Sequence, residues 1–395
     1  MQRKKLLIVG AGRLCLQILQ VLAPRNQFEF HVASRDLEQA TRLCNLVRQA
    51  ALQLNVVVQI RGWAMDLRDA CIGCNAETLS KIKPDIVLNC ASLQSTSELT
   101  ALDKEKFDAL DQAGFGPWLP LHLAPAYALM RAVKQSCPKA LVVNAAYPDA
   151  VNAVLYKVGM APDVGIGNIA NLVPATRCAI ARLSGSDPVK VCVKLVGHHY
   201  FSQYVPRFGL PVDAPEQGCS LSYWIDGHEY TDEWSEEVIF GCVADEFRRL
   251  GGVDAHYLTA MSAVAVLENL YSDIEVRVHA PGPHGLPGGY PIKVGMGKVL
   301  LDLPFGVRRE EAIQVNEAGQ RQDGIQSILA DGTVVFGDKQ CELMRKLLNF
   351  RMTDMKVGDA AEWARELACK FRAYAQDSRQ TASHLPVGGS PAFAR

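Results

Sequence analysis

The chain has 395 residues, of which 49% are hydrophobic and 21% are charged, and its 41 basic and 42 acidic side chains give a formal net charge of -1. This average globular composition excludes disordered, collagen-like and coiled-coil classes, and the charge balance lacks the basic footprint of a nucleic-acid binder. The length predicts two domains, or one large domain with an appended half, and no apolar stretch reaches the roughly 18 residues that span a bilayer. We therefore expect a cytoplasmic protein that binds neither nucleic acid nor membrane and that acts on a small molecule.

The first 145 residues alternate short apolar runs with longer segments of helical periodicity. The apolar runs predict buried strands over residues 6–9, 28–33, 56–60, 85–90 and 140–144. The periodic segments predict helices over residues 14–22, 37–54 and 121–135. Strands that alternate with helices in this way form a parallel sheet with helices on both faces. The sequence therefore predicts an α/β protein that begins with a doubly wound parallel sheet.

A glycine-rich turn joins the first predicted strand to the first predicted helix. In Gly10-Ala-Gly12-Arg-Leu-Cys15, Gly10 would form the tight turn, and Gly12 would let the backbone approach a pyrophosphate at the helix N-terminus. Cys15 occupies the third glycine position, which requires only a small residue. In this context the turn predicts a Rossmann domain that binds a nicotinamide dinucleotide. The predicted cofactor contacts here are Gly10, Gly12, Arg13 and Leu14.

The end of the second predicted strand bears on the choice between NADP and NAD. An NAD enzyme would place an acid there for the ribose hydroxyls, but this strand ends in Ser34 and Arg35, which can bind and neutralise a 2′-phosphate. We therefore predict NADP; in the alternative, Asp36 binds the ribose of NAD and Arg35 is solvated. The other cofactor residues expected at strand ends are Asp66 near the adenine, and Asn89 and Ala91 on the nicotinamide side.

From residue 150 onward the pattern changes to that of an α+β domain. Helices are predicted over 150–158, 237–270, 310–319 and 360–375, with another ending at 183, and strands over 189–196, 292–294 and 299–303. A hairpin over 326–336 is expected to turn at Asp331-Gly332, and Asp323-Gly324 is interpreted as a simple turn. Proline and glycine predict loops within 206–227 and 281–289. We assign residues 1–150 to the Rossmann domain, 151–376 to a substrate domain and 377–395 to a disordered tail.

Two adjacent histidines follow the strand predicted over residues 189–196. In Gly197-His198-His199-Tyr200, a neutral imidazole could accept a proton from an alcohol, and a protonated one could donate a proton to a carbonyl as hydride moves. The alternative interpretation is a pair of partly buried, hydrogen-bonded histidines without a catalytic role.

The twelve cysteines are scattered, and only Cys71 and Cys74 form a CxxC pair. A zinc site would need a second pair of ligands at a recognisable spacing, and none follows nearby. His279 and His284 have no acids or cysteines beside them in the sequence. We therefore predict no metal site and expect the thiols to be small core or surface residues.

The central part of the sequence resembles the lactate and malate dehydrogenase superfamily. Order and spacing are similar over residues 142–199, through Val142-Val-Asn144, Asp149, Tyr156-Lys157, Gly159, Gly165-Ile-Gly167-Asn168, Arg177, Ile180, Gly185 and Gly197-His198-His199. The N-terminal glycine motif agrees. Gly288-Gly289-Tyr-Pro-Ile and Leu301-Asp-Leu-Pro304 are similar to the closing strands of that family.

The resemblance implies roles for three residues. His199 would exchange the proton with the substrate, Asn144 would contact the nicotinamide or the substrate, and Arg177 would bind a substrate carboxylate. By the same analogy we expect a homo-oligomer.

The sequence also departs from the family at two places. The aspartate that orients the histidine should precede Arg177 by a few residues, but residues 171–174 contain no carboxylate. Residues 92–118, where the family supplies arginines for a 2-oxo acid, offer only Lys104 and Lys106. The resemblance therefore implies a related enzyme whose substrate is not a simple 2-oxo acid.

The predicted function is an NADP(H)-dependent oxidoreductase that transfers hydride between the nicotinamide and a carbonyl or hydroxyl group of its substrate. Two alternatives stay open. Ser34-Arg35 and Asp66 also resemble the NADP-binding half of saccharopine reductase-like enzymes, which implies an imine reductase acting on a C–N bond. The missing aspartate and loop arginines favour a dinucleotide-binding protein without catalysis, because a fold does not dictate a function.

Overall fold

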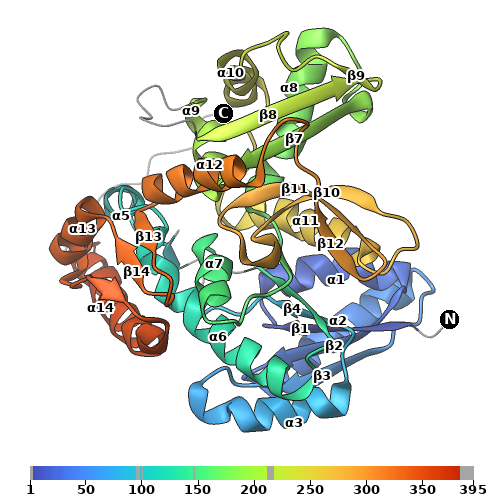
Figure 1. The fold of residues 1–395 in the computed structure, drawn as a ribbon. Coiled ribbons are helices and arrows are strands. Elements are labelled where there is room, and N and C mark those ends of the chain that lie inside the picture. Colours follow the sequence, from blue (N-terminus) through green and yellow to red (C-terminus); the bar gives the residue numbers. More distant parts are fainter. Residues whose placement is uncertain (1–2, 95–97, 100, 146, 211–217, 383–395) are drawn as a thin grey trace, which may run out of the picture.

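The computed structural model describes residues 3–94, 98–99, 101–145, 147–210 and 218–382, and for residues 377–382 it describes the backbone only. The N-terminal part is built on a parallel sheet in the order β3-β2-β1-β4-β5-β6 (Figure 1). Its strands are β1 (Lys4–Val9), β2 (Phe28–Ser34), β3 (Ile60–Ala64), β4 (Ile86–Asn89), β5 (Leu141–Asn144) and β6 (Val164–Gly165). The helices of this part are α1 (Arg13–Arg25), α2 (Leu37–Gln53), α3 (Ile72–Ile82), α5 (Lys104–Asp111), α6 (Leu119–Ser136) and α7 (Ala150–Lys157). The predicted doubly wound Rossmann sheet is confirmed.

The central strand β1 shows why this sheet needs helices on both faces. Successive side chains of a strand point to opposite faces. Leu6 and Ile8 enter one core, which they share with α1 and α2, whereas Leu7 and Val9 enter a second core with α3 and α6. The apolar run that predicted a strand in the sequence is therefore buried on both sides.

The first domain differs from the sequence prediction in three respects. The third strand lies at Ile60–Ala64 rather than 56–60, because its pairing with β2 begins at Ile60, and Val57 is 74% exposed. Neither α3 nor α5 was predicted. The sheet also takes its sixth strand, β6, from beyond the predicted boundary at residue 150.

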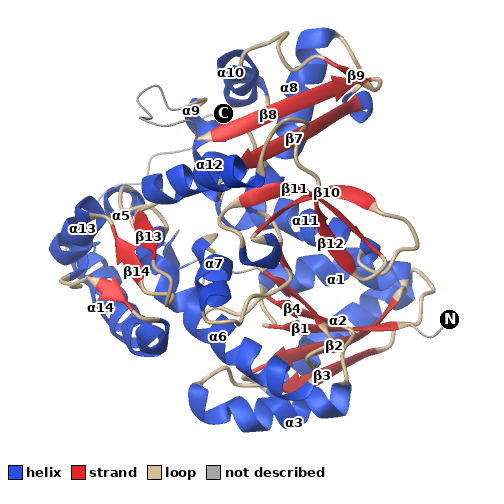
Figure 2. Ribbon diagram, viewed as in Figure 1, coloured by secondary structure: helices blue, strands red, loops and turns tan. Residues whose placement is uncertain are grey.

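The second part is an α+β unit on an antiparallel sheet in the order β10-β11-β7-β8-β9, with β12 paired to β11 (Figure 2). Its strands are β7 (Val191–Gly197), β8 (Cys219–Ile225), β9 (His228–Glu229), β10 (Val276–Pro281), β11 (Gly289–Gly295) and β12 (Lys298–Leu301). Its helices are α8 (Val173–Ser184), α9 (His199–Phe208), α10 (Glu236–Glu246), α11 (His256–Asn269) and α12 (Arg309–Gln322). The loop predicted over 206–227 instead includes the end of α9 and all of β8, and residues 211–217 of that loop lie outside the described residues.

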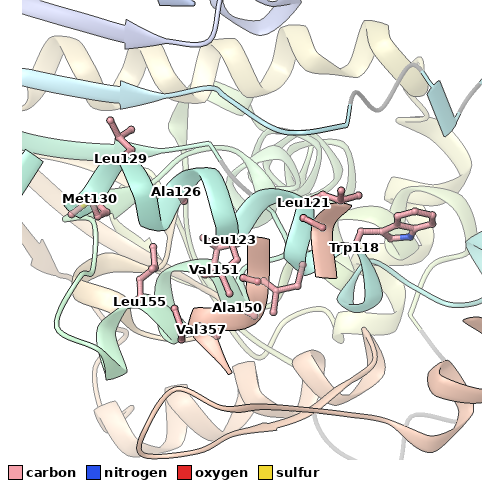
Figure 3. Packing of buried hydrophobic residues seen from close by; sticks show 14 of the residues in the cluster. Trp118, Leu121, Leu123, Ala126, Leu129, Met130, Ala150, Val151, Leu155 and Val357 are labelled. Carbon is pink, nitrogen blue, oxygen red and sulfur yellow. The ribbon is translucent and has the colours of Figure 1, made fainter. Parts of the chain in front are cut away.

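The C-terminal part returns to the first domain. It consists of β13 (Ile325–Ile328), β14 (Val334–Phe336), β15 (Asp354–Met355), α13 (Asp338–Leu348) and α14 (Ala360–Ala382), and the predicted β13–β14 hairpin is confirmed. The ring of Phe371 on α14 meets that of Trp118 edge to face, with centroids 5.6 Å apart. Figure 3 shows Val357 near Val151 and Leu155 of α7, beside α6.

The start of the predicted disordered tail is helical. Residues 377–382 form the end of α14, and residues 383–395 lie outside the described part of the chain. Within the residues that the structure describes, α14 included, no helix combines the length and the apolar character that crossing a bilayer requires.

Candidate active site

A cavity of about 820 Å³ opens at the carboxyl ends of the parallel strands. In open α/β sheets this crevice is the usual ligand site. The predicted cofactor residues that line it are Gly10, Gly12, Arg13, Leu14, Ser34, Arg35, Asp66 and Ala91. The structure thus brings eight of the nine predicted cofactor residues to one surface, and only Asn89 is not part of the lining.

The glycine turn has the geometry that a dinucleotide site requires. Gly10 has φ +108°, and a Cβ built on it would lie 2.8 Å from the backbone of Cys90 and Ala91, so a side chain cannot be accommodated. Gly12, which precedes the first residue of α1, has open space where its Cβ would be. Cys15 is fully buried in the core behind the turn. The first amides of α1 are therefore accessible to an anion, as a pyrophosphate would need.

Charged side chains gather at the end of β2. Asp36 caps the N-terminus of α2, where its Oδ1 accepts hydrogen bonds from the amides of Glu38 and Gln39 at 2.9 and 3.1 Å. Asp36 does not line the cavity, whereas Arg35 does. Although partial burial opposes it, the Arg68 guanidinium lowers the pKa of Asp66, with a smaller contribution from Arg35. The guanidiniums of Arg68 and Arg35 thus both act on the Asp66 carboxylate.

Asn89 and Asn144 lie beneath the cavity, not on its surface. Asn89 Nδ2 donates to Asn144 Oδ1 at 2.8 Å, and Asn144 Nδ2 donates to Asn152 Oδ1 at 2.7 Å. Asn152 Nδ2 donates in turn to the carbonyl of Gly282 at 3.3 Å, and Asn89 Oδ1 accepts the amide of Ala91 at 3.1 Å. These buried amides connect the cofactor loop after β4 to the second domain. This placement does not support the expected contact of Asn144 with nicotinamide or substrate.

At the other end of the cavity, two carboxylates flank His199. Its Nδ1 lies 3.4 Å from Oδ2 of Asp149, and its Nε2 lies 3.3 Å from Oδ2 of Asp323. The exposed fractions of the three residues are 2%, 3% and 1%. Asp149 is itself held in place, because its Oδ2 accepts the His199 amide at 2.8 Å and its Oδ1 accepts a bond from Asn168 Nδ2. Residues 171–174 contain no carboxylate, and two carboxylates from other segments lie beside His199 instead.

These neighbours set the charge of each group. Burial alone would lower the pKa of His199, but the charges of Asp323 and Asp149 outweigh it and raise that pKa to about 10. Burial, together with the charge of His199, lowers the pKa of His198 to about 4. Although burial opposes it, His199 lowers the pKa of Asp149 to about 2. Near neutral pH the site therefore holds an imidazolium at His199, a neutral His198 and an ionised Asp149.

Asp323 reaches the site because α12 packs very closely on the β7–α9 turn. A Cβ on Gly319 of α12 would lie 2.3 Å from the Cβ of His198, so only glycine permits this approach. Asp323 follows the last residue of α12, and its Oδ1 accepts the amide of Phe115 at 3.0 Å. The turn interpretation of Asp323-Gly324 therefore missed its contact with His199. In the sequence, the glycine at position 319 inside a predicted helix was the only local indication of this close packing. No nearby residue indicated that His198 packs against it.

Aromatic rings from three segments surround the histidine on the cavity side. The rings of His122 and Tyr147 are tilted by 42° with centroids 4.1 Å apart, and the Phe115 ring lies 5.5 Å from both Tyr147 and His199. Burial lowers the pKa of His122 to about 3, so this side chain is neutral. The aromatic wall shields the charged groups around His199 from water.

Neither the predicted substrate-binding residue Arg177 nor the two lysines of residues 92–118 line the cavity. Arg177 donates hydrogen bonds to backbone carbonyls, including one from its Nε to the oxygen of Val191 at 2.8 Å. Lys104 pairs with Asp108 on the same helix, and Lys106 Nζ donates to the carbonyl of Tyr374 at 2.9 Å. The expected role of Arg177 is therefore not supported. The arginines that line the substrate end are Arg207 and Arg249, which sequence reasoning missed.

Asp149, His198 and His199 also place potential metal-ligand atoms within 4.8 Å of one another. However, Asp149 Oδ2 already accepts the His199 amide, and His198 Nδ1 accepts the Tyr200 amide at 3.3 Å. These hydrogen bonds tie the groups to the backbone and to each other, which favours an acid–base role over a metal centre.

The overall structure is similar to those of lactate and malate dehydrogenases. Malate dehydrogenase from Cryptosporidium parvum aligns with a TM-score of 0.56 at 17% identity, covering 82% of this chain and 98% of that chain. Malate dehydrogenase from Aeropyrum pernix aligns with a TM-score of 0.53 at 18% identity, covering 80% and 95%. Lactate dehydrogenase from Eimeria maxima, solved with NADH and oxamate, aligns with a TM-score of 0.53 at 15% identity, covering 81% and 94%.

These likenesses confirm the predicted fold, a Rossmann domain followed by a C-terminal domain. No family model matches the sequence, and neither does any curated protein.

Proposed function

We propose that the protein is an NADP(H)-dependent oxidoreductase that transfers hydride between the nicotinamide and a carbonyl, hydroxyl or imine carbon of a small substrate. The observation that carries this proposal is the single cavity that runs from the glycine turn and Arg35 to the flanked imidazole of His199. A bound nicotinamide would supply or accept the hydride at the carbon atom. The chain itself must then supply or accept one proton at the neighbouring oxygen or nitrogen atom.

His199 is the group that we assign to proton exchange. Its Nε2 and the Oδ2 of Asp323 lie 3.3 Å apart, yet neither atom makes a hydrogen bond of good geometry. Because His199 lines the cavity, a substrate oxygen or nitrogen that binds against this ring would accept its proton. Asp149 holds the ring from its Nδ1 side and stabilises its charge. In the reductive direction His199 gives one proton to the substrate and ends neutral, and a bound NADPH would supply the hydride.

The assignment of His199 is tested by His199→Gln. We expect turnover to fall by about 100-fold or more, in the range of lost general acid–base catalysis, while NADPH affinity stays nearly unchanged. The cofactor residues lie at the other end of the cavity, so a parallel loss of NADPH binding would point to misfolding. Turnover equal to that of the wild type would remove the assignment.

NADP rather than NAD is proposed because Arg35 lines the cavity while Asp36 is engaged as a helix cap. A titration of the purified protein with NADPH and NADH, followed by nucleotide fluorescence, tests this choice. NADPH is expected to bind more tightly than NADH. If neither nucleotide binds, the oxidoreductase proposal fails as a whole.

The remaining candidate functions differ in the bond that is reduced, if any. The carboxylates beside His199 are compatible with a protonated imine as well as with a neutral carbonyl, so an imine reductase stays the alternative. Assays with ketones alone and with ketones plus an amine distinguish them, because only an imine reductase needs both. NADPH binding without oxidation across this panel would favour a non-catalytic dinucleotide-binding protein. Assembly into a homo-oligomer and a cytoplasmic location remain predictions.

A further inference from the structure

A guanidinium without a carboxylate partner among the described residues lies at the substrate end of the cavity. Arg249 is half-buried and lines the cavity. It donates to the carbonyls of Asn171 and Ser202, each at 3.0 Å. An arginine carries five N–H donors, so these two bonds leave donors for another partner. Both of its bonds are to neutral carbonyls, and within the described part of the chain no carboxylate pairs with its positive charge.

A second guanidinium lines the same cavity. Arg207 lies on α9 and is exposed, and it pairs with Oδ2 of Asp111 at 3.2 Å. Burial, and then the charge of Arg207, lower the pKa of Arg249. Two like charges in one cavity disfavour each other, and an anion between them would stabilise both. Three acids also line the cavity. Asp66 and Asp111 are paired with arginines, and Glu98 has an interaction of its own.

The charges around His199 have the opposite sign. Asp149 and Asp323 lie within 3.4 Å of its ring nitrogens. A substrate carboxylate attached directly to the reacting carbon would be repelled by both. Arg249 instead bonds to Ser202, which lies three residues beyond His199 on the same helix, or roughly 4.5 Å along the helix axis. A favourable place for an acidic group is therefore about one helical turn from the proton-exchanging imidazole.

Resting on the proposed function, we propose that Arg249, assisted by Arg207, binds a carboxylate or phosphate group of the substrate that a short carbon chain separates from the reacting carbon. The planar guanidinium fork matches both anions through paired N–H bonds. The substrate class is thus an oxo acid with its carbonyl remote from the carboxylate, or a phosphorylated oxo compound. This class differs from the 2-oxo acids, whose carboxylate adjoins the carbonyl.

Three five-carbon compounds test the position and the charge of this group. Binding of 4-oxopentanoate, 2-oxopentanoate and 2-pentanone to the protein–NADPH complex is measured by calorimetry, with hydroxyacetone phosphate and hydroxyacetone as the phosphate arm. We expect 4-oxopentanoate or hydroxyacetone phosphate to bind at least about 10-fold more tightly than its neutral analogue, in line with charge-assisted hydrogen bonds. 2-Oxopentanoate should bind more weakly than 4-oxopentanoate. Equal binding of the charged and neutral members in both arms would overturn the proposal.

Variants then assign the effect to the arginines. Arg249→Gln should weaken binding of the anionic compound by about 10- to 100-fold without changing the NADPH dissociation constant. Arg249→Lys should restore part of the affinity because it restores the charge, and Arg207→Gln should give a smaller loss. Asp111→Asn should strengthen binding, since it removes a carboxylate that competes for Arg207. The matched control is Arg248→Gln, because Arg248 is exposed and does not line the cavity.

The result can be separated from the fate of the proposed function. Arginine-dependent binding of an anion without NADPH oxidation would support this subsite and remove hydride transfer. Oxidation of NADPH with 4-oxopentanoate or hydroxyacetone phosphate at a rate that is unaffected by Arg249→Gln would support hydride transfer and overturn the subsite. A loss of NADPH binding in folded Arg249→Gln would also overturn it, because the arginine would then serve the dinucleotide.

Discussion

Replacing Asp323 with asparagine should lower the pKa of the His199 imidazolium by several pH units. The two charged atoms lie 3.3 Å apart, and at an effective dielectric constant of 20 their attraction is on the order of 5 kcal/mol. Since 1.36 kcal/mol corresponds to one pH unit, the attraction between His199 and Asp323 alone raises the pKa of His199 by roughly three to four pH units. It is therefore large enough to account for much of the rise of the His199 pKa to about 10. The asparagine oxygen can still accept the amide of Phe115, so the local fold is retained.

The ionisation can be followed by NMR of histidines labelled at Cε1. The His199 signal is assigned by its absence in His199→Gln and titrated between pH 5 and 11. The wild-type signal should remain that of an imidazolium through neutrality, and in Asp323→Asn it should titrate several pH units lower. Asp331→Asn serves as the control, because that carboxylate lies in an exposed turn whose Oδ1 accepts the amide of Thr333. A wild-type His199 that titrates near 6.5, or one that is insensitive to Asp323→Asn, would refute the electrostatic reasoning.

Three further outcomes follow from the structure. Arg35→Ala should weaken NADPH binding by about 1.5 to 3 kcal/mol, the range for charged hydrogen bonds, and leave NADH binding nearly unchanged, as nucleotide fluorescence would report. Gly319→Ala should lower the free energy of unfolding, measured by chemical denaturation, by about 1 to 3 kcal/mol, because the added methyl group clashes with His198. The control Gly241→Ala has open space for its methyl group and should be neutral or stabilising. Histidines kept neutral by burial have a folded-state pKa below the unfolded value near 6.5. As the pH falls below about 6.5, each of them should therefore lower the free energy of unfolding by up to about 1.4 kcal/mol per pH unit. A constant free energy of unfolding between pH 7 and 5 would contradict this expectation. The histidines concerned are His122, His198 and His279.

The first domain was the most predictable part of the fold because its signals are local. Each buried strand is a short apolar run, and the glycine turn follows the first one directly. The exception is β3, where pairing with β2 rather than local hydrophobicity decides which residues form the strand. The helix α14 was predicted too short for a related reason. Its polar residues 377–382 carry no apolar periodicity, and they continue a helix that packing against α6 has already established.

The site was predictable at its cofactor end and only partly at its substrate end. The residues after β1, β2 and β4 are brought together by the rule that the carboxyl ends of parallel strands share one edge. The partners of His199 obey no such rule, because Asp149 and Asp323 come from segments far apart in the chain. Asp149 was visible in the resemblance but had no role there, and Asp323 was interpreted as a turn residue. Arg249 lies in a predicted helical block and gave no signal of its cavity contact.

The second carboxylate changes what His199 can do. With a pKa of about 10, removing its proton at pH 7 costs about 4 kcal/mol, which corresponds to roughly a thousandfold lower population of the neutral base. An imidazole in that state is a ready proton donor but a poor acceptor. If His199 exchanges the proton, reduction is therefore favoured near neutral pH, and oxidation should accelerate as pH rises toward 10. Asp323→Asn should shift this balance toward oxidation at neutral pH, because it returns the imidazole to a range in which both protonation states are populated.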